Sequence, residues 1–376
     1  MLEALLFLCA VASWVYWLLA CWWVRGFFRH GRSNPDSSFT PPVSILKPVK
    51  GLDFQAYENF VSFCQQDYPE FELLFGVSDV ADPAVPVIER LQHDFPQRNI
   101  GLFVAQGTGP NYKASVLHHL AGQAHHEVLV VSDSDIRVTP DYLRRVIAPL
   151  ANEHIGLVTC PYRGEAAFNL TARLEALYWG STFLPSVIVA RRFLNMRFAL
   201  GATIALRHSD LARLGGFAAV ADYLADDYQI GARVAGLGQR VHLSDYIVAS
   251  VLGATIFRDQ WDREVRWARC SRVSRPLEYP GILLTFSTPL AVTLALATGF
   301  APSGRLVLTV SLLVRWLVAW LVAGYTGDQV VRRWLIWLPV RDILSALVWC
   351  AGGLGRSVTW RGEKFRLLPD GRMFYW

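Results

Sequence analysis

The sequence predicts an α/β domain with a mostly parallel sheet, inserted between an N-terminal membrane helix and C-terminal membrane segments. Three observations lead to this prediction. Hydrophobic residues make up 53% of the 376 residues and charged residues 18%, whereas ordinary soluble domains have about half and about a quarter. The apolar excess is concentrated at the two ends of the chain. Between the ends, short apolar runs alternate with amphipathic stretches, as strands and helices do in α/β proteins.

The composition also excludes several classes of protein. A net charge of only +5 with a high apolar content excludes a disordered chain. The six cysteines lack the paired spacing of a zinc cluster or a disulfide scaffold. Basic residues flank the apolar runs and form no patch on the soluble part, so nucleic acid is not an expected partner.

Residues 1–24 are predicted to form an N-terminal transmembrane anchor. The run from Leu2 to Val24 has the ~20 residues that cross a hydrocarbon core of ~30 Å. A cleaved signal peptide carries positive charge before its apolar run, but here Arg25, Arg29 and Arg32 follow it. The positive-inside rule then places the N-terminus outside and the chain from residue 25 in the cytoplasm.

Residues 25–42 have the Gly, Ser and Pro content of a linker, and residues 43–253 are predicted to form the α/β domain. The predicted strands are 43–49, 72–77, 100–104 and 128–132, and the predicted helices are 56–66, 85–94 and 112–121. Sheets of this class bind ligands beyond the carboxyl ends of their strands. Residues that directly follow strands are therefore the candidates for a site.

Acidic residues occupy such positions at Asp79 and at the pair Asp133 and Asp135. Two carboxylates separated by one residue can hold Mg²⁺ or Mn²⁺ and leave coordination positions for substrate phosphates. Asp and Ser are also common in turns, which is the alternative interpretation of this pair. A third acidic site, Asp226-Asp227, either begins a helix or supplies a general base that takes a proton from an attacking hydroxyl.

Residues 254–280 are predicted to form an amphipathic interfacial segment that contains Arg263, Arg266 and Trp267. Arginines at this spacing can bind phosphate through paired hydrogen bonds. A basic helix beside a membrane run can instead lie on anionic lipid. The two interpretations can hold for different faces of one helix.

Residues 281–355 are predicted to form a transmembrane hairpin, 281–300 and 306–325, followed by a re-entrant or interfacial segment at 334–354. Pro339, Arg341 and Asp342 interrupt that last segment. Arg315 lies in the middle of the second run, where a charge is either functional or paired within the helix bundle, and we favour pairing. Residues 356–376 form a basic tail that the charge rule places in the cytoplasm.

The order of these motifs resembles the signature of membrane-bound family 2 and family 21 glycosyltransferases with a GT-A catalytic domain. That signature consists of Asp79, Asp133-x-Asp135, Asp227 and Arg263-x-x-Arg266-Trp267. The sequence is most similar to the ceramide glucosyltransferase family. Further motifs that fit this family are Ser44–Gly51, Gln66–Pro69, Asn111-x-Lys113, Gly215-Gly216-Phe217, Ala225–Tyr228 and Thr359–Gly362.

The resemblance implies a role for each matching residue. Asp133 and Asp135 would hold Mg²⁺ or Mn²⁺ on the diphosphate, and Asp227 would be the base. The nucleotide-sugar side would be formed by Lys47, Asp79, Lys113, Asp133 and Arg263. Arg266 and Trp267 would line the diphosphate and the acceptor, and the acceptor side would also include Gly216, Phe217 and Asp226.

The resemblance further implies an integral protein of a bacterial inner membrane that transfers glucose, with inversion, from a UDP-sugar to the primary hydroxyl of ceramide. The eukaryotic members have Gly where Asp135 stands, and they carry a His in the segment that corresponds to Gly180–Pro185. Bacterial relatives that glycosylate hopanoids share the same motifs, so transfer of N-acetylglucosamine to a hopanoid is the alternative. A polysaccharide synthase is a further alternative, but it needs more spanning helices. A transporter would need repeats that two or three late membrane runs cannot form, and the intact motifs argue against a non-catalytic scaffold.

Overall fold

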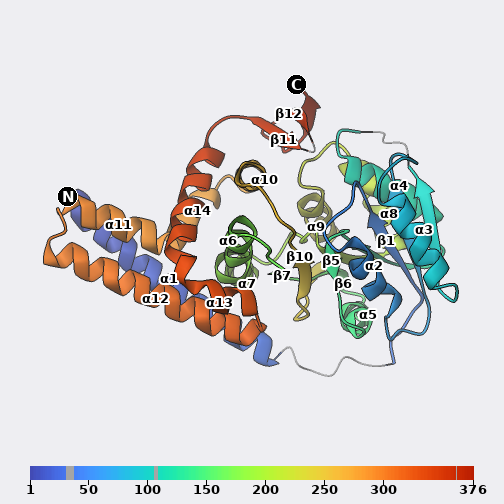
Figure 1. Ribbon diagram of the computed structural model, residues 1–376, viewed down its shortest axis with the longest axis horizontal. Helices are drawn as coiled ribbons and strands as arrows, with labels where there is room; N and C mark the ends of the chain where they lie inside the picture. Colours follow the sequence, from blue (N-terminus) through green and yellow to red (C-terminus); the bar gives the residue numbers. More distant parts are fainter. Residues whose placement is uncertain (31–37, 106–108, 361) are drawn as a thin grey trace. The chain divides into compact units, whose positions relative to one another are not determined.

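The computed structural model describes residues 1–30, 38–105, 109–360 and 362–376, and Figure 1 shows its elements. It divides into two compact units. The sheet unit comprises residues 31–162, 194–253 and 367–376, and the helical unit comprises residues 1–30, 163–193 and 254–366. The predicted domain 43–253 is therefore interrupted, because residues 163–193 belong to the helical unit. Part of the predicted linker, residues 31–37 with Arg32, and Arg361 of the tail lie outside the described residues.

The sheet unit is built on a sheet with the strand order β3-β2-β1-β4-β8-β6-β9. Its strands are β1 (Val43–Pro48), β2 (Phe71–Val77), β3 (Asn99–Val104), β4 (Val128–Ser132), β6 (Ile155–Thr159), β8 (Thr203–Arg207) and β9 (Arg240–Leu243). Strands β3, β2, β1 and β4 are parallel, and β8 runs antiparallel to its neighbours β4 and β6. The predicted α/β fold with a mostly parallel sheet is confirmed.

The helices of the sheet unit are α2 (Ala56–Cys64), α3 (Val85–Asp94), α4 (Tyr112–Gln123), α5 (Tyr142–Ile147), α8 (His208–Arg213) and α9 (Asp226–Gly236), with the short helices η1 (Ala148–Ala151) and η3 (Phe217–Val220). Two strands outside the main sheet, β5 (Ile136–Arg137) and β10 (Val248–Val251), pair antiparallel. The elements predicted between residues 43 and 132 all form, and their bounds agree to within two residues.

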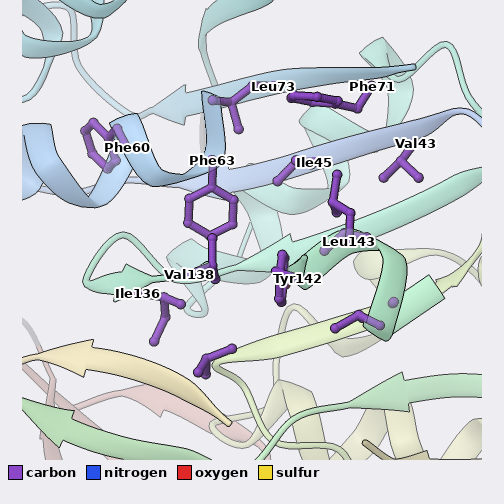
Figure 2. Packing of buried hydrophobic residues seen from close by; sticks show 14 of the residues in the cluster. Val43, Ile45, Phe60, Phe63, Phe71, Leu73, Ile136, Val138, Tyr142 and Leu143 are labelled. Carbon is purple, nitrogen blue, oxygen red and sulfur yellow. The ribbon is translucent and has the colours of Figure 1, made fainter. Parts of the chain in front are cut away.

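Strands β1, β2 and β4 are buried on both faces along their whole length, which explains why they are mostly apolar rather than alternating. One apolar cluster joins Ile45 and Leu73 to Phe63 of α2 and Tyr142 of α5. Figure 2 shows this packing, in which the Phe63 and Tyr142 rings lie 5.8 Å apart. Leu46 belongs to a second apolar cluster, which also contains residues of α4, η3 and α9. The sheet is thus a rigid base for the loops at its edge.

The helical unit consists of mostly apolar helices and the segments between them. Its longer helices are α1 (Leu2–His30), α6 (Leu170–Tyr178), α7 (Leu184–Phe193), α10 (Phe257–Ser274), α11 (Ser287–Ala297), α12 (Pro302–Thr326) and α14 (Leu338–Gly353). Its shorter elements are η2 (the π-helix Trp179–Phe183), η4 (Tyr279–Thr285), α13 (Gln329–Trp334), η5 (Leu335–Trp337) and the strand β11 (Ser357–Trp360). The strands β7 (Tyr162–Glu165) and β12 (Glu363–Leu367) cross the unit boundary, and β13 (Met373–Tyr375) lies in the sheet unit.

Helix α1 continues six residues past the predicted end of the anchor at Val24. Phe27 and Phe28 make an edge-to-face contact, and the Arg191 guanidinium lies 4.9 Å from the centre of the Phe27 ring. These contacts favour helix over the predicted linker conformation at residues 25–30. Along its length α1 packs beside α11 and α12 (Figure 1), with Ala10, Ala291 and Val307 in one buried cluster.

Among the residues that the structure describes, three helices are long and apolar enough to cross a membrane, namely residues 2–29, 302–326 and 329–353. The first half of the predicted hairpin is different, because η4 and α11 are bent by 73° relative to each other. Pro289 explains the break: its ring clashes with the carbonyl of Thr285, four residues earlier, in a continuous helix. That carbonyl instead accepts a hydrogen bond of 3.2 Å from Trp17 Nε1. The predicted membrane run at 281–300 is therefore bent near Pro289, and its path across the membrane remains a prediction.

Arg315, which lies in the middle of α12, is paired, as the sequence favoured. Its guanidinium donates to both carboxylate oxygens of Asp342 at 2.9 and 2.8 Å, and both residues are buried. Thr288 donates a further hydrogen bond of 2.7 Å to Asp342. This pair joins α12 to α14 within the helical unit.

The location of the tail is a testable consequence of the charge rule. A cysteine at Ser357, in a background without the native cysteines, is expected to react with an impermeant thiol reagent only after the cells are permeabilised. The matched control is a cysteine at Ser303, in the predicted outer turn of the hairpin, which should react in intact cells. Both side chains are exposed in the structure. Reaction at Ser357 in intact cells would show that residues 329–353 cross the membrane.

Candidate active site

The carboxyl end of β4 carries Asp133, and two lysines approach it within the sheet unit. Lys113 of α4 forms an ion pair of 2.5 Å with Asp133 Oδ1. Lys47, at the end of β1, donates to the Asp133 carbonyl at 2.9 Å and to Ser132 Oγ at 3.3 Å. The parallel pairing of β1 with β4 places these residues together, because the carboxyl ends of both strands lie at one edge.

Lys47 is fully buried, with its ammonium group 3.6 Å from the centre of the Phe63 ring. Burial lowers the pKa of Lys47 to about 7, although the carboxylates of Asp133, Asp135 and Asp53 act in the opposite direction. For Lys113, burial alone would lower the pKa, but Asp133, Asp226 and Asp227 raise it above its ordinary value. Lys113 is therefore a fixed positive charge among carboxylates.

The second carboxylate of the pair, Asp135, accepts a hydrogen bond of 2.6 Å from Ser250 of β10. Burial and the nearby carboxylates Asp133 and Asp53 raise the pKa of Asp135 to about 7. Asp53 belongs to this cluster because it accepts a hydrogen bond of 2.5 Å from Ser134. The cluster holds excess negative charge at one edge of the sheet.

Asp226 and Asp227 begin α9, and they lie beside Lys113. A methyl group on Gly201 would be 3.3 Å from Asp227 Oδ2 and 3.4 Å from Lys113 Nζ, so both charged groups lie over the same backbone. Burial and the neighbouring Asp226 raise the pKa of Asp227 to about 6. Burial also raises the pKa of Asp226, whereas Lys113 lowers it. Asp227 is thus a carboxylate whose proton affinity suits a general base near neutral pH.

Asp79 lies two residues beyond β2 and is exposed. Its carboxylate accepts a hydrogen bond of 2.9 Å from the Ala81 amide, which is the turn geometry common for Asp. Its predicted contact with the nucleotide remains a prediction.

Two of the predicted acceptor-side residues have structural roles. Phe217 is fully buried and packs in the second apolar cluster. Gly216 has a φ of 68°, in the left-handed region that favours glycine, and it precedes η3. Their contact with an acceptor remains a prediction.

In the helical unit, the predicted interfacial segment forms α10, and several of its side chains form ion pairs or hydrogen bonds. Arg263 forms an ion pair of 2.5 Å with Glu175 of α6, which is buried. Arg341 of α14 donates two hydrogen bonds of 2.8 and 2.7 Å to Glu264, and both residues are buried. Glu264 also accepts a hydrogen bond of 2.7 Å from Gln260. Arg263 thus fixes α10 in this structure, and its role toward a nucleotide sugar remains a prediction.

The other two residues of the motif face aromatic partners. The Trp267 ring lies 6.3 Å from the ring of Trp179 in η2. The Arg266 guanidinium lies 5.6 Å from the centre of the Trp360 ring. The helical unit therefore holds Arg263, Arg266 and Trp267 on one braced helix, and the sheet unit holds the carboxylates.

The residues around Asp133 and Asp135 suit a divalent cation that is completed by substrate. Within residues 1–30, 38–105, 109–360 and 362–376, no group of three or more His, Cys, Asp or Glu side chains is arranged to hold a metal by itself. Mg²⁺ is usually bound by one or two carboxylates together with substrate phosphates. Burial and the carboxylates of Asp133 and Asp53 raise the pKa of Asp135, and a cation beside it would stabilise its anionic form.

A mostly parallel sheet with a pair of carboxylates after β4, together with apolar helices, is the architecture expected of a GT-A glycosyltransferase with candidate membrane spans. A solved structure of this class agrees with the fold: the chain has a TM-score of 0.54 and 19% identity to the mannosyltransferase PcManGT from Pyrobaculum calidifontis in complex with GDP-Man and Mn²⁺. That match covers 93% of this chain and 99% of the other.

The chain belongs to glycosyl transferase family 21, whose model matches residues 5–373. It is 26% identical over 359 residues to ceramide glucosyltransferase 3 of Caenorhabditis elegans, covering 92% of this chain and 76% of the relative. It is 24% identical over 360 residues to ceramide glucosyltransferase 1 of the same organism, covering 92% and 75%. The predicted family is therefore confirmed.

Sequence reasoning missed several residues that the structure brings to the site or its supports. Asp53 is separated by about a third of the domain from Asp135, and the acidic residue in Gly51-Leu-Asp53 has no strand directly before it. Glu175 and Glu264 carry no motif signal of their own. The signal that could have identified them is an acidic residue within an otherwise apolar or basic helix, because a buried acid almost always has a charged partner.

Proposed function

We propose that this protein is an inverting glycosyltransferase that moves glucose from UDP-glucose to the primary hydroxyl of ceramide at the membrane surface. The observation that carries the proposal is the juxtaposition of Asp227, with a pKa raised to about 6, and the cluster of Lys113, Asp133 and Asp135. The named relatives and the apolar helices support a lipid acceptor.

In this proposal Asp227 accepts the proton of the lipid hydroxyl as its oxygen attacks the anomeric carbon. The bond from that carbon to the UDP oxygen breaks on the opposite face, so an α-linked donor gives a β-glycoside. Lys113, which is held at Asp133 and Gly201, provides a positive charge near the diphosphate. Asp133 and Asp135 would hold Mg²⁺ or Mn²⁺, which stabilises the developing negative charge on the leaving diphosphate.

In this proposal the lipid acceptor explains why the chain has apolar helices. Each CH₂ group of a lipid contributes ~0.8 kcal/mol to its retention in the bilayer. An acceptor with long chains therefore stays in the membrane, and the enzyme must bring a water-soluble donor to it. Arg266 and Trp267 on α10 are the residues we assign to the diphosphate and acceptor side.

Product mass is the direct test. The purified protein in detergent is incubated with UDP-glucose, UDP-N-acetylglucosamine, divalent metal, ceramide and a hopanoid polyol. A hexosylceramide supports the proposal. An N-acetylhexosamine-hopanoid would move the acceptor and donor to the alternative. A polymer in place of a single-sugar lipid would contradict both.

Substitution of Asp135 by alanine is expected to weaken Mn²⁺ binding and to lower transfer by about 10²-fold, because one of two metal ligands is lost. Mn²⁺ binding in the presence of UDP is measured by electron paramagnetic resonance, which is independent of turnover. Asp141→Ala is the matched control, since Asp141 is an exposed acid near the same β5 strand. Unchanged Mn²⁺ binding in Asp135→Ala would remove Asp135 from the metal site.

A further inference from the structure

The last residues of the chain are tied to the segment that precedes the proposed base. Met373 of β13 donates its amide hydrogen to the Asp222 carbonyl at 2.7 Å, and the Leu224 amide donates to the Gly371 carbonyl at 3.2 Å. Tyr223 and Arg372 form the antiparallel bridge between these two bonds. The tail thus adds a short strand to residues 222–224, which lead directly into Asp226 and Asp227.

The same segment is held on its other side by Asn111, which is buried. Asn111 donates from its side chain to the Tyr223 carbonyl at 2.8 Å and from its backbone to the Ala221 carbonyl at 2.9 Å. Its side-chain oxygen accepts from the Ala114 amide and caps α4. Residues 221–224 therefore lie between the tail and the start of the helix that carries Lys113.

Helix α9 needs such support because its own start lacks a capping side chain. Its N-cap is Ala225, which offers no oxygen to the first turn. The helix nevertheless begins with two acids whose carboxylates repel each other and face Lys113. Asn111 and Lys113 also act on Asp226, and Asp227 Oδ1 accepts a hydrogen bond of 2.7 Å from the Tyr228 amide. The backbone that enters the helix is thus one of the supports of the two acids.

The tail is built into the sheet unit rather than loosely attached to it. The side chains of Leu367 and Met373 are each 1% exposed. Between them the chain turns through hydrogen bonds from Leu368 to Arg372 and from Gly371 to Leu368, at 2.9 and 3.0 Å. In contrast, the final residues Phe374, Tyr375 and Trp376 are more than half exposed.

We propose that the C-terminal strand, through the main-chain groups of Gly371 and Met373, positions Asp227 for proton transfer. This inference rests on the proposed function of Asp227 as the base. Gly371 and Met373 are positioning residues, since their contacts are with residues 222–224 and not with the reacting atoms. Turnover therefore requires the C-terminal strand.

The test uses the full-length protein with Met373→Pro, which removes one amide donor, and a deletion of residues 371–376. The comparison variant is a deletion of residues 374–376, which removes the end of β13 and its exposed side chains but keeps both hydrogen bonds to residues 222–224. For each protein we would measure kcat, the KM for the donor, the dissociation constant for UDP and the melting temperature. Amide hydrogen exchange of residues 221–228 provides a readout that does not depend on activity.

We expect kcat to fall about tenfold or more in Met373→Pro and the longer deletion, because small displacements of a reacting group are costly. UDP binding should be unchanged, and exchange in residues 221–228 should be faster. The shorter deletion should resemble the wild type. Unchanged kcat with unchanged exchange would overturn the inference, as would parallel losses of kcat, UDP binding and melting temperature. If the wild type makes no glycolipid, the proposed function fails, whereas unchanged exchange in the variants refutes only the strand's hold on the segment.

Discussion

Replacing Asp227 with asparagine is expected to lower kcat by about 10²- to 10⁴-fold, which is the usual contribution of a general base. UDP binding should be largely retained, because the amide keeps the size of the side chain and Lys113 with Asp133 remains in place. The measurement is glycolipid formation under saturating substrates, together with calorimetric titration of UDP. An equal loss of UDP binding would count against the assignment of Asp227 as the base.

Two further variants and the pH dependence sharpen this test. Asp226→Asn distinguishes the two candidate bases, and Glu153→Gln controls for loss of negative charge, since Glu153 is an exposed acid outside residues 222–227. The active form of the base is the carboxylate, so kcat/KM should rise with pH through about 6, where Asp227 loses its proton. Below that pH activity should fall tenfold per unit. At saturating divalent metal, which keeps Asp135 ionised, the acidic limb should be absent from the residual activity of Asp227→Asn.

Substitution of Arg341 by methionine is expected to destabilise the helical unit by about 3–5 kcal/mol, the usual cost of leaving one member of a buried ion pair uncompensated. Glu264 would then stay buried without the two hydrogen bonds that Arg341 donates. Because Glu264 lies between Arg263 and Arg266, α10 should lose its fixed position and transfer should fall with stability. The melting temperature in detergent and the glycolipid yield are the measurements.

The double variant Arg341→Met with Glu264→Met is the decisive comparison. Removal of both charges leaves an apolar contact of similar volume, which is often neutral or stabilising. We therefore expect the double variant to melt well above the single variant. Arg372→Gln, which breaks a surface pair with Asp370, should change stability by less than about 1 kcal/mol. A double variant as unstable as the single one would show that the ion pair itself is not the source of the loss.

Much of the fold could be predicted because its signals are local. The strands at 43–48, 71–77 and 128–132 are short apolar runs bounded by turn residues, and their parallel pairing follows from the helices between them. The position of Asp133 and Asp135 follows from the same rule, since residues after parallel strands meet at one edge. The bend between η4 and α11 was not predicted, although Pro289 was visible, because a proline in an apolar run is also tolerated within a straight span.

The candidate site likewise combines residues that the sequence identified with partners that only the packing brings together. The sequence by itself determined the class of fold and the family, and it identified Asp133, Asp135 and Asp227 as candidates, because strands, turns and short motifs are each read from neighbouring residues. Only the tertiary structure decided the partners: Lys113 at Asp133, Asp53 at Ser134, Arg341 at Glu264 and the C-terminal strand at residues 222–224. The physical reason is that periodicity reports which face of an element is apolar, whereas hydrogen bonds and ion pairs between distant segments depend on how the elements pack.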